Sequence, residues 1–313
     1  MKSLQLEGER LLKLRDVECP EAKDSEEVVL VQAAGIGGSE YLGFNNPGIR
    51  PLPNAMGHGF AGITSNQDRV AVYPLSGCGQ CHYCEANQSQ LCDHWALIGV
   101  QSDGGFAQRV SVPRDQIVRI PDDLSWENSV FIEPFANSIN AWELSGADDA
   151  ETIAVIGCGS LGLGLVACAH RANNRFIDIA EPSETRREAA LFLGANAAQP
   201  NLDREYDVVF DTVGSASTRQ QGIQATRKGG KCVFLGFETP ETAINMSEMI
   251  RGQKTLLGSF VYSKKQFSDA IQLVELCDDS WVKNVRFDQV EDCLVSFLEG
   301  DFSCVKVALR PNV

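Results

Sequence analysis

The sequence has few basic residues and no long apolar run. It contains 27 Lys and Arg against 42 Asp and Glu, which gives a formal net charge of −15. A surface of that sign repels phosphate backbones and anionic lipid headgroups, so we expect neither nucleic-acid nor membrane partners. A membrane-spanning helix needs about 20 consecutive apolar residues, and the runs here are far shorter. The segment MKSLQLEGERLLKLRD lacks the apolar core of a secretory signal, and we therefore expect a cytoplasmic protein.

Cysteine is plentiful, but its pattern does not resemble a disulfide framework. Four of the 11 cysteines crowd into the segment from Cys78 to Cys92, and most of the others lie inside apolar runs, where cysteine behaves as a small buried hydrophobe. An odd total without an export signal indicates reduced thiols.

The length of 313 residues corresponds to about two domains at roughly 150 residues each. The first third contains short β-like runs separated by turn residues, among them VVLVQAAGIGG, DRVAVYP, FAQRVSVP and QIVRIP. Residues 125–144 have the spacing of one helix, ended by Gly146. From Thr152 to Phe260 strands alternate with helices, the last helix of this series spanning TRQQGIQATRKGG. The fold class is therefore α/β, with a parallel sheet between helices. A further helix is expected over SKKQFSDAIQLVELCDD, and the strand SCVKVALRP follows it.

A dinucleotide-binding turn follows the strand TIAVI. It reads Gly157-Cys158-Gly159-Ser160-Leu161-Gly162, a GxGxxG between a predicted strand and a predicted helix. Gly157 permits the tight turn, Gly159 lets a pyrophosphate approach, and Gly162 lets the helix pack closely on the strand. The free N–H groups of Ser160 and Leu161 at the helix start suit the phosphates. The alternative is a glycine turn that serves only packing.

The expected strand RFIDIA ends at Glu181, an acidic residue in the position that contacts an adenosine ribose. A carboxylate there repels a 2′-phosphate, so NAD is favoured over NADP. Arg186 and Arg187 weaken this preference, because an arginine near the ribose is how NADP is accommodated. We assign Arg186 to the cofactor site, although an exposed helix face is the simpler interpretation of both arginines.

Four cysteines form the pattern C-x2-C-x2-C-x7-C. Four thiolates on closely spaced turns suit a tetrahedral zinc ion, and Cys78, Cys81, Cys84 and Cys92 fill every coordination position, so this zinc is structural. An iron–sulfur cluster can use similar spacing, although the bacterial form has proline after the last cysteine and here Asp93 follows. His82 and His94 are expected at the surface.

Together these residues resemble the zinc-containing medium-chain dehydrogenase/reductase family, in particular its polyol and threonine dehydrogenase branch. The likeness runs nearly end to end, through AAGIGGSE, MGHGFAG, CGQCHYC, GGFAQRVSVP, IEPFANSINA, VIGCGSLGLG, DVVFDTVG, GGKCVFLGF and KVALRP. It implies a GroES-like, β-rich catalytic domain formed by residues 1–140 and 261–313, with the zinc lobe at 78–92. A Rossmann NAD-binding domain is implied for residues 141–260.

The resemblance also implies a catalytic zinc on a cysteine, a histidine and a glutamate. His58 and Glu133 stand at two of these positions, but the cysteine position is Gly37 and the occasional fourth ligand is Gly59. A catalytic zinc needs about three protein ligands and an open position. For His58 the other interpretation is an ordinary buried histidine, and for Glu133 a carboxylate at a helix end.

Three neighbours complete the expected catalytic centre. Ser39 keeps the hydroxyl that passes the alcohol proton, whereas Leu42 replaces the histidine that relays it. Glu40 stands where the family has aspartate, and its extra methylene could let it join His58 and Glu133 as a weak metal site. The centre could equally hold no metal, with Ser39 or Tyr41 stabilising the oxygen.

The main hypothesis is an NAD(H)-dependent oxidoreductase that interconverts a secondary alcohol or polyol and its ketone, with one structural zinc and an uncertain catalytic one. The alternatives are a metal-independent carbonyl reductase, a nucleotide-binding member without turnover, and an enzyme that oxidises its substrate transiently within a lyase or epimerase cycle. The expected partner is a small alcohol or ketone, and we expect a homodimer or homotetramer.

Overall fold

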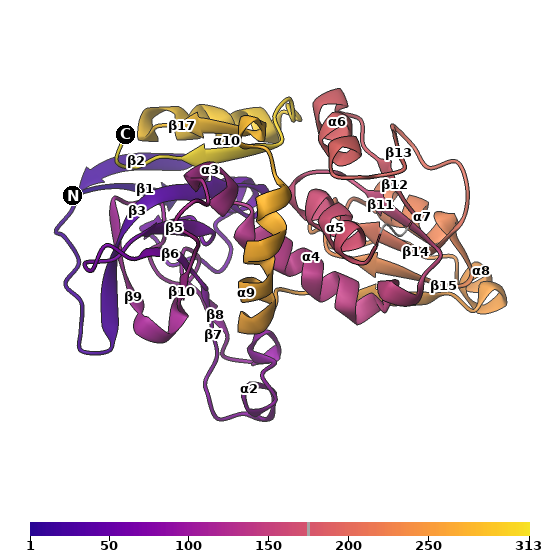
Figure 1. Ribbon diagram of the computed structural model, residues 1–313, viewed down its shortest axis with the longest axis horizontal. Helices are drawn as coiled ribbons and strands as arrows, with labels where there is room; N and C mark the ends of the chain where they lie inside the picture. Colours follow the sequence, from indigo (N-terminus) through magenta and orange to yellow (C-terminus); the bar gives the residue numbers. More distant parts are fainter. Residues whose placement is uncertain (174–175) are drawn as a thin grey trace. The chain divides into compact units, whose positions relative to one another are not determined.

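The computed structural model describes residues 1–173 and 176–313. The chain forms two compact units, one made of Met1–Glu133 with Ser263–Val313 and the other of Pro134–Tyr262. Both chain ends belong to the first unit (Figure 1). Among the described residues, no helix is long and apolar enough to cross a membrane.

The first unit is built on β3 (Glu26–Ile36), whose last four residues are all buried. It lies inside a seven-stranded sheet of order β10-β6-β5-β3-β18-β17, with β9 paired to β3 as well. Strand β18, near the end of the chain, runs antiparallel to β3 and pairs Val307 with Ile36. The other strands are β5 (Phe60–Ile63), β6 (Arg69–Val72), β9 (Arg109–Pro113), β10 (Ile117–Arg119), β17 (Val282–Val285) and β18 (Lys306–Leu309).

A three-stranded sheet closes the core of this unit. Its strands are β1 (Lys2–Gly8), β2 (Leu11–Asp16) and β4 (Asn54–Ala55), in the order β2-β1-β4. The core beneath it joins fully buried side chains of both sheets, such as Leu6 and Val29, with Phe106 from the loop before β9. Burying each such side chain contributes about 1.5–3 kcal/mol, which is what holds the short strands in place.

The helices of the first unit are short. They are α1 (Gly38–Asn45), α2 (His82–Glu85), α3 (Trp126–Ser129), α9 (Lys264–Leu273) and α10 (Val290–Leu298), and β7 (Leu75–Ser76) pairs with β8 (Ala96–Leu97). The Ser263 hydroxyl caps α9 by accepting a hydrogen bond from the Gln266 N–H, and Phe267 and Ile271 are buried on this helix as their spacing predicts. Val274 is also buried, in the 3-10 turn that follows.

The second unit contains a parallel six-stranded sheet of order β13-β12-β11-β14-β15-β16. This is the doubly wound order, in which ligands bind at the carboxyl ends of the strands where the order reverses, here between β11 and β14. The strands are β11 (Thr152–Ile156), β12 (Phe176–Ala180), β13 (Ala197–Gln199), β14 (Tyr206–Asp211), β15 (Thr226–Phe234) and β16 (Thr255–Gly258). The helices are α4 (Ile132–Ser145), α5 (Ser160–Arg171), α6 (Glu184–Phe192), α7 (Ala216–Ala225) and α8 (Met246–Gly252).

Two predicted helices differ from the observed ones. Residues 125–144 form α3 and α4 rather than one helix, because Pro134 has no N–H to bond back to the preceding turn and instead occupies the first turn of α4. Gly146 does end the second helix, with φ of 67°. In the segment TRQQGIQATRKGG the helix stops at Ala225, because Thr226 has an extended backbone, with ψ of 124°, and begins β15. The strand RFIDIA, expected before Glu181, was predicted to begin at Arg175, and Arg175 lies outside the described residues.

Candidate functional site

The glycine turn links β11 to α5. Gly157 has φ of 86°, and a Cβ there would lie 2.5 Å from Val213 Cγ2. A Cβ at Gly162 would lie 2.1 Å from the Gly157 carbonyl oxygen, so any side chain would push the helix off the strand. Gly159 caps α5, whose first N–H groups belong to Ser160 and Leu161. The turn therefore offers free backbone donors at a helix N-terminus.

Glu181 follows β12 and is only 3% exposed. Its Oε2 accepts a hydrogen bond of 2.7 Å from the Cys158 N–H, and its Oε1 accepts one of 2.9 Å from the Ser183 N–H. The carboxylate thus braces the glycine turn from the neighbouring strand. The contact with a ribose stays a prediction, since each oxygen keeps a second lone pair.

The expectation that Arg186 and Arg187 form an exposed helix face is wrong. Both are half-buried. Arg187 Nη1 donates hydrogen bonds of 2.9 Å to the Glu181 carbonyl and 2.7 Å to the Pro182 carbonyl. Arg186 lies over the turn, because a Cβ at Gly159 would be 3.7 Å from its Nη1. Arg187 folds back toward β12 because the carbonyls of Glu181 and Pro182 are within reach of its guanidinium group.

The sequence analysis missed a second turn at the same edge of the sheet. Asp211 ends β14 and is fully buried, and its Oδ1 accepts hydrogen bonds of 3.0 Å from the N–H groups of both Val213 and Gly214. The Thr212 hydroxyl donates 3.0 Å bonds to the carbonyls of Ile156 and Gly157. The available signal was the run DVVFDTVG, which ends a strand with acidic, hydroxyl and glycine residues.

The four cysteines come together in the loop between β7 and β8. The Sγ atoms of Cys78, Cys81, Cys84 and Cys92 all lie within 4.8 Å of one another. The N–H groups of Cys78 and His94 donate to Cys92 Sγ at 3.4 Å and 3.3 Å. Such N–H···S bonds stabilise thiolate charge, and the donor set fits one tetrahedral zinc.

Backbone donors also favour the ionised form of two of these thiols. Burial opposes ionisation of Cys84, but hydrogen bonds from the Gly79 N–H and from neighbouring side chains outweigh it and lower the pKa of Cys84 to about 7. A hydrogen bond from the Gln80 N–H lowers the pKa of Cys78. His82 and His94 are exposed, as expected.

The second cluster lies where β3 runs into α1. His58 Nδ1 is 2.7 Å from Glu40 Oε1, and His58 Nε2 is 3.5 Å from Glu133 Oε1. The other oxygen of Glu40 accepts a 3.0 Å hydrogen bond from the Gly37 N–H. The side chains of His58, Glu40 and Glu133 are 14%, 4% and 13% exposed. A buried imidazole therefore sits between two carboxylates.

Charge interactions dominate the ionisation of this cluster. Burial opposes the charge on His58, but Glu40 and Glu133 outweigh it and raise the pKa of His58 to about 10. Burial likewise opposes ionisation of Glu40, and the charges of His58, Lys306 and Arg50 hold the pKa of Glu40 below its usual range. These shifts favour the charged forms of His58 and Glu40.

These residues do not fit the catalytic zinc that the resemblance implies. Glu40 contacts the ring nitrogen opposite the one that faces Glu133, so it orients His58 and does not complete a shared donor set. Within the described ranges, the lobe cysteines are the only set of three or more His, Cys, Asp or Glu ligand atoms gathered within 4.8 Å. A Cβ at Gly59 would lie 2.9 Å from Glu133 Cβ, so an acidic fourth ligand has no room there.

Two cations adjoin this cluster, and neither was found from the sequence. Arg50 Nη2 lies 3.3 Å from the Ser39 carbonyl and 3.4 Å from the Ser39 hydroxyl, and Ser39 itself is exposed on α1. Lys306, the first residue of β18, is only 7% exposed. The lysine in KVALRP was visible, but its place beside β3 depends on strand pairing that the sequence does not reveal.

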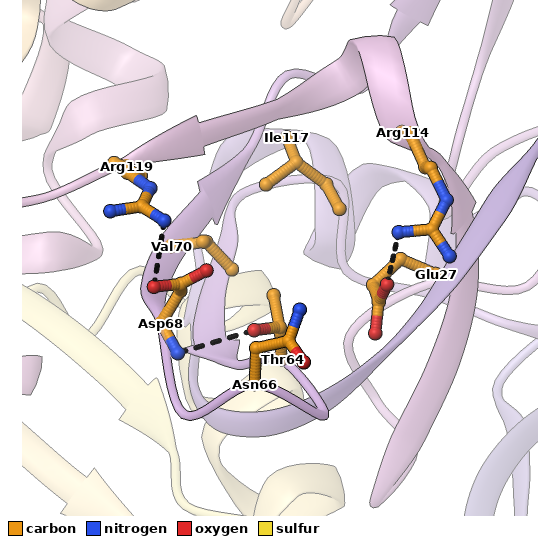
Figure 2. Close-up of a pocket in the computed structure, with 8 residues that line it drawn as sticks. All are labelled: Glu27, Thr64, Asn66, Asp68, Val70, Arg114, Ile117 and Arg119. Atoms are coloured by element: carbon orange, nitrogen blue, oxygen red, sulfur yellow. Dashed lines mark hydrogen bonds and ion pairs between the residues drawn. The ribbon is translucent and has the colours of Figure 1, made fainter.

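A separate hollow of about 380 Å³ opens beside the turn between β5 and β6. Figure 2 shows an ion pair at each end of it, Glu27 with Arg114 and Asp68 with Arg119. A hydrogen bond of 3.2 Å from the Asp68 N–H to the Thr64 hydroxyl closes the turn. The charged groups around the hollow are paired with one another. We therefore interpret these ion pairs as contacts that stabilise the turn between β5 and β6.

Two family models match the chain. The model described as "Alcohol dehydrogenase GroES-like domain" matches residues 23–122, and the one described as "Zinc-binding dehydrogenase" matches residues 160–275. The first match lies in the β-rich unit, and most of the second lies in the unit with the parallel sheet.

Whole-chain relatives agree with these matches. A sorbitol dehydrogenase of Bacillus subtilis is 28% identical over 100% of this chain and 98% of its own length. An L-galactonate-5-dehydrogenase of Escherichia coli is 28% identical over 82% of each chain. A zinc-binding dehydrogenase of Sinorhizobium meliloti, whose crystal structure holds NADP, is 27% identical, covers 99% of both chains and has a TM-score of 0.89.

The matches extend over both units and over the glycine turn, the lobe and the His58 cluster. They support the expected nicotinamide cofactor and zinc at the level of the family. The chain therefore belongs to the zinc-type medium-chain dehydrogenase/reductase family.

Proposed function

We propose that this protein is an NAD(H)-dependent oxidoreductase that interconverts a secondary alcohol or polyol with the corresponding ketone. The observation that carries the proposal is the glycine turn at the N-terminus of α5, braced by Glu181 from the neighbouring strand. Relatives named for sorbitol and for L-galactonate oxidation support a polyhydroxylated substrate. When bound, a nicotinamide supplies the hydride acceptor or donor.

The residues of the chain then have separate tasks. The N–H groups at the start of α5 bind the pyrophosphate, and Glu181 both holds the turn and faces the ribose. Cys78, Cys81, Cys84 and Cys92 hold a zinc ion that closes the lobe and leaves no open coordination position. Glu40 fixes the His58 ring by its contact with Nδ1.

Proton transfer is assigned to Ser39. Its hydroxyl is exposed and lies 3.4 Å from Arg50 Nη2. The positive charge of Arg50 favours release of a proton from this hydroxyl to water. Leu42 cannot relay protons, so the path from substrate oxygen to solvent runs through Ser39 rather than through a histidine on α1.

A nucleotide-binding protein without turnover is the second candidate, and the poor fit of a catalytic zinc favours it. The two are separated by incubating the protein with NAD and a panel of polyols, including sorbitol and butane-2,3-diol, and following NADH. Steady NADH formation that is lost in Ser39→Ala supports the dehydrogenase. Cofactor binding by fluorescence titration, with no NADH from any polyol, supports the second candidate instead.

A further inference from the structure

A buried lysine lies beside the position that has lost the family's cysteine. β18 pairs with β3 through Val307 and Ile36, which places Lys306 next to Gly37. A Cβ at Gly37 would lie 3.3 Å from Lys306 Nζ. A Cβ at Gly35 would lie 3.0 Å from Lys306 Cε and 3.2 Å from its Nζ. The lysine stem therefore lies over Gly35 of β3 and Gly37 just after it, and its amino group lies beside the position where the family has its cysteine ligand.

The same position borders the ionised cluster. A Cβ at Gly37 would also lie 3.8 Å from Glu40 Oε2, so the ammonium and this carboxylate both lie close to position 37. A buried ammonium is costly unless it is stabilised by nearby negative charge. Glu40 supplies such charge here, while its other oxygen keeps hold of His58.

The residues around position 37 do not favour a metal ion. Gly37 carries no thiolate, Glu40 contacts the ring nitrogen of His58 that faces away from Glu133, and the Lys306 ammonium lies 3.3 Å from the Cβ that a cysteine at position 37 would have. A divalent cation brought to His58 and Glu133 would meet fewer donors than zinc requires, and it would be repelled by the neighbouring positive charge.

We propose that the Lys306 ammonium acts in place of the catalytic zinc, as the positive charge that stabilises the substrate oxygen. The inference rests on the proposed dehydrogenase function and specifies its mechanism. In the oxidative direction the substrate C–H bond breaks and its electron pair passes as hydride to NAD. The O–H bond breaks, its proton leaves through the Ser39 hydroxyl to water, and the C=O bond forms. Lys306 stays protonated throughout and donates a hydrogen bond to the oxygen while negative charge develops on it.

A purely structural lysine that only neutralises Glu40 would explain the same contacts. The two roles differ in what a neutral side chain of similar length does. Lys306→Met keeps the stem over the glycines but removes the charge. If the charge is catalytic, kcat falls by about 100- to 1,000-fold, the usual effect of losing one donor to a developing oxyanion. Lys283→Met, at an exposed lysine on β17, is the matched control and keeps wild-type kcat.

Chemical rescue makes the test specific. In Lys306→Ala, added ethylammonium restores part of the lost kcat, whereas potassium chloride at the same ionic strength does not. Wild-type kcat in Lys306→Met overturns the proposal. If Lys306→Met loses kcat but its circular dichroism spectrum shows that it is unfolded, the Lys306→Ala variant decides the question. Rescue of its kcat by ethylammonium supports the catalytic charge, and failure of rescue in folded Lys306→Ala overturns it.

Zinc counts test the replacement without any assay of turnover. After dialysis against EDTA, wild type and Lys306→Met are expected to retain one zinc per chain, and this zinc disappears in Cys84→Ser. The double variant Gly37→Cys with Lys306→Met restores the thiolate and removes the repelling charge, so it is expected to retain two. A second zinc in wild type that is lost in His58→Ala overturns the proposal, and so does a double variant that retains only one.

These counts keep the two hypotheses apart. If no polyol in the panel yields NADH, the proposed function fails, yet one zinc in wild type and two in the double variant still show that the Lys306 charge and the missing thiolate keep a second zinc out of this cluster. If NADH forms but wild type holds two zincs, the dehydrogenase stands and the role of Lys306 is overturned.

Discussion

His58 Nδ1 lies 2.7 Å from Glu40 Oε1, and this contact joins a histidine at the end of one loop to the third residue of helix α1. The Glu40 carboxylate also accepts the Gly37 N–H, so a single side chain caps the helix and sets the orientation of the ring. Shortening or neutralising Glu40 therefore disturbs the helix start and the imidazole together.

We predict that Glu40→Gln lowers the pKa of His58 from its raised value of about 10. Burial disfavours the imidazolium, so removal of one of its two carboxylate neighbours leaves that cost less opposed. A histidine whose folded pKa lies above its unfolded value of 6.5 stabilises the fold below pH 6.5, and this contribution disappears as the pH rises toward 10. The loss of stability in Glu40→Gln should thus be about 3 kcal/mol near pH 6 and smaller at pH 10.

The measurement is urea unfolding of both proteins across this pH range, with NMR titration of the His58 ring. The ring resonance of the exposed His82 serves as the internal chemical-shift reference. An unchanged His58 titration in Glu40→Gln would show that the contact carries no charge interaction.

Much of the second unit follows from local sequence signals. The glycine turn and the acid after β12 have fixed spacing, and a parallel sheet brings the carboxyl ends of its strands to one edge regardless of details. Arg186 and Arg187 could not be placed in this way. Arg187 is held by carbonyls after β12 and Arg186 lies over the glycine turn, and neither contact is encoded in propensity or periodicity.

The first unit shows the limit of the sequence more clearly. The lobe was found because its ligands are close in the chain, whereas Lys306 and Gly37 are far apart and meet only through the pairing of β18 with β3. The helices α1 and α10 were also missed. α1 begins with Gly38, Ser39 and Glu40, which show no apolar period, and its start depends on the hydrogen bond that Glu40 accepts from the Gly37 N–H.

The second prediction concerns the lobe. Cys84→Ser removes one of four sulfurs that lie within 4.8 Å of one another, so zinc retention and the melting temperature should both fall. NADH affinity should stay within about twofold of wild type, since the glycine turn belongs to the other unit. Cys293→Ser, outside the lobe, is the control for loss of a thiol. Wild-type protein that is fully folded without zinc would refute the structural role of the ion.

The third prediction is a preference for NADH over NADPH that depends on Glu181. Its carboxylate and a 2′-phosphate would be close anions. Glu181→Gln removes the charge and keeps only one of the two oxygens that accept the Cys158 and Ser183 N–H groups, so both affinities should fall while the preference narrows by about tenfold, or roughly 1.4 kcal/mol. Nicotinamide fluorescence titration measures both affinities, and Glu184→Gln on the exposed start of α6 is the control. Tighter binding of NADPH to wild type would mean that Arg186 dominates the site.

The last prediction concerns Gly37→Cys as a single change. The backbone at Gly37 is extended, with φ of −154°, so a side chain is tolerated there, and its Cβ would lie 3.3 Å from Lys306 Nζ. A thiol beside an ammonium ionises more readily than a free one. We therefore expect this cysteine to form a thiolate paired with Lys306, and the protein to retain one zinc per chain rather than two.

The pH dependence of alkylation at position 37 shows whether the thiolate is paired with Lys306. Mass spectrometry of peptides after brief iodoacetamide treatment gives the alkylation rate at position 37 as a function of pH. In Gly37→Cys the midpoint should lie at least about one pH unit below that of the double variant with Lys306→Met, assayed in EDTA so that no metal masks the thiol. Coincident midpoints would mean that the ammonium does not face position 37. A second zinc in the single variant would show that the thiolate binds metal in spite of Lys306. The proposal that the Lys306 charge acts in place of the zinc would then be wrong.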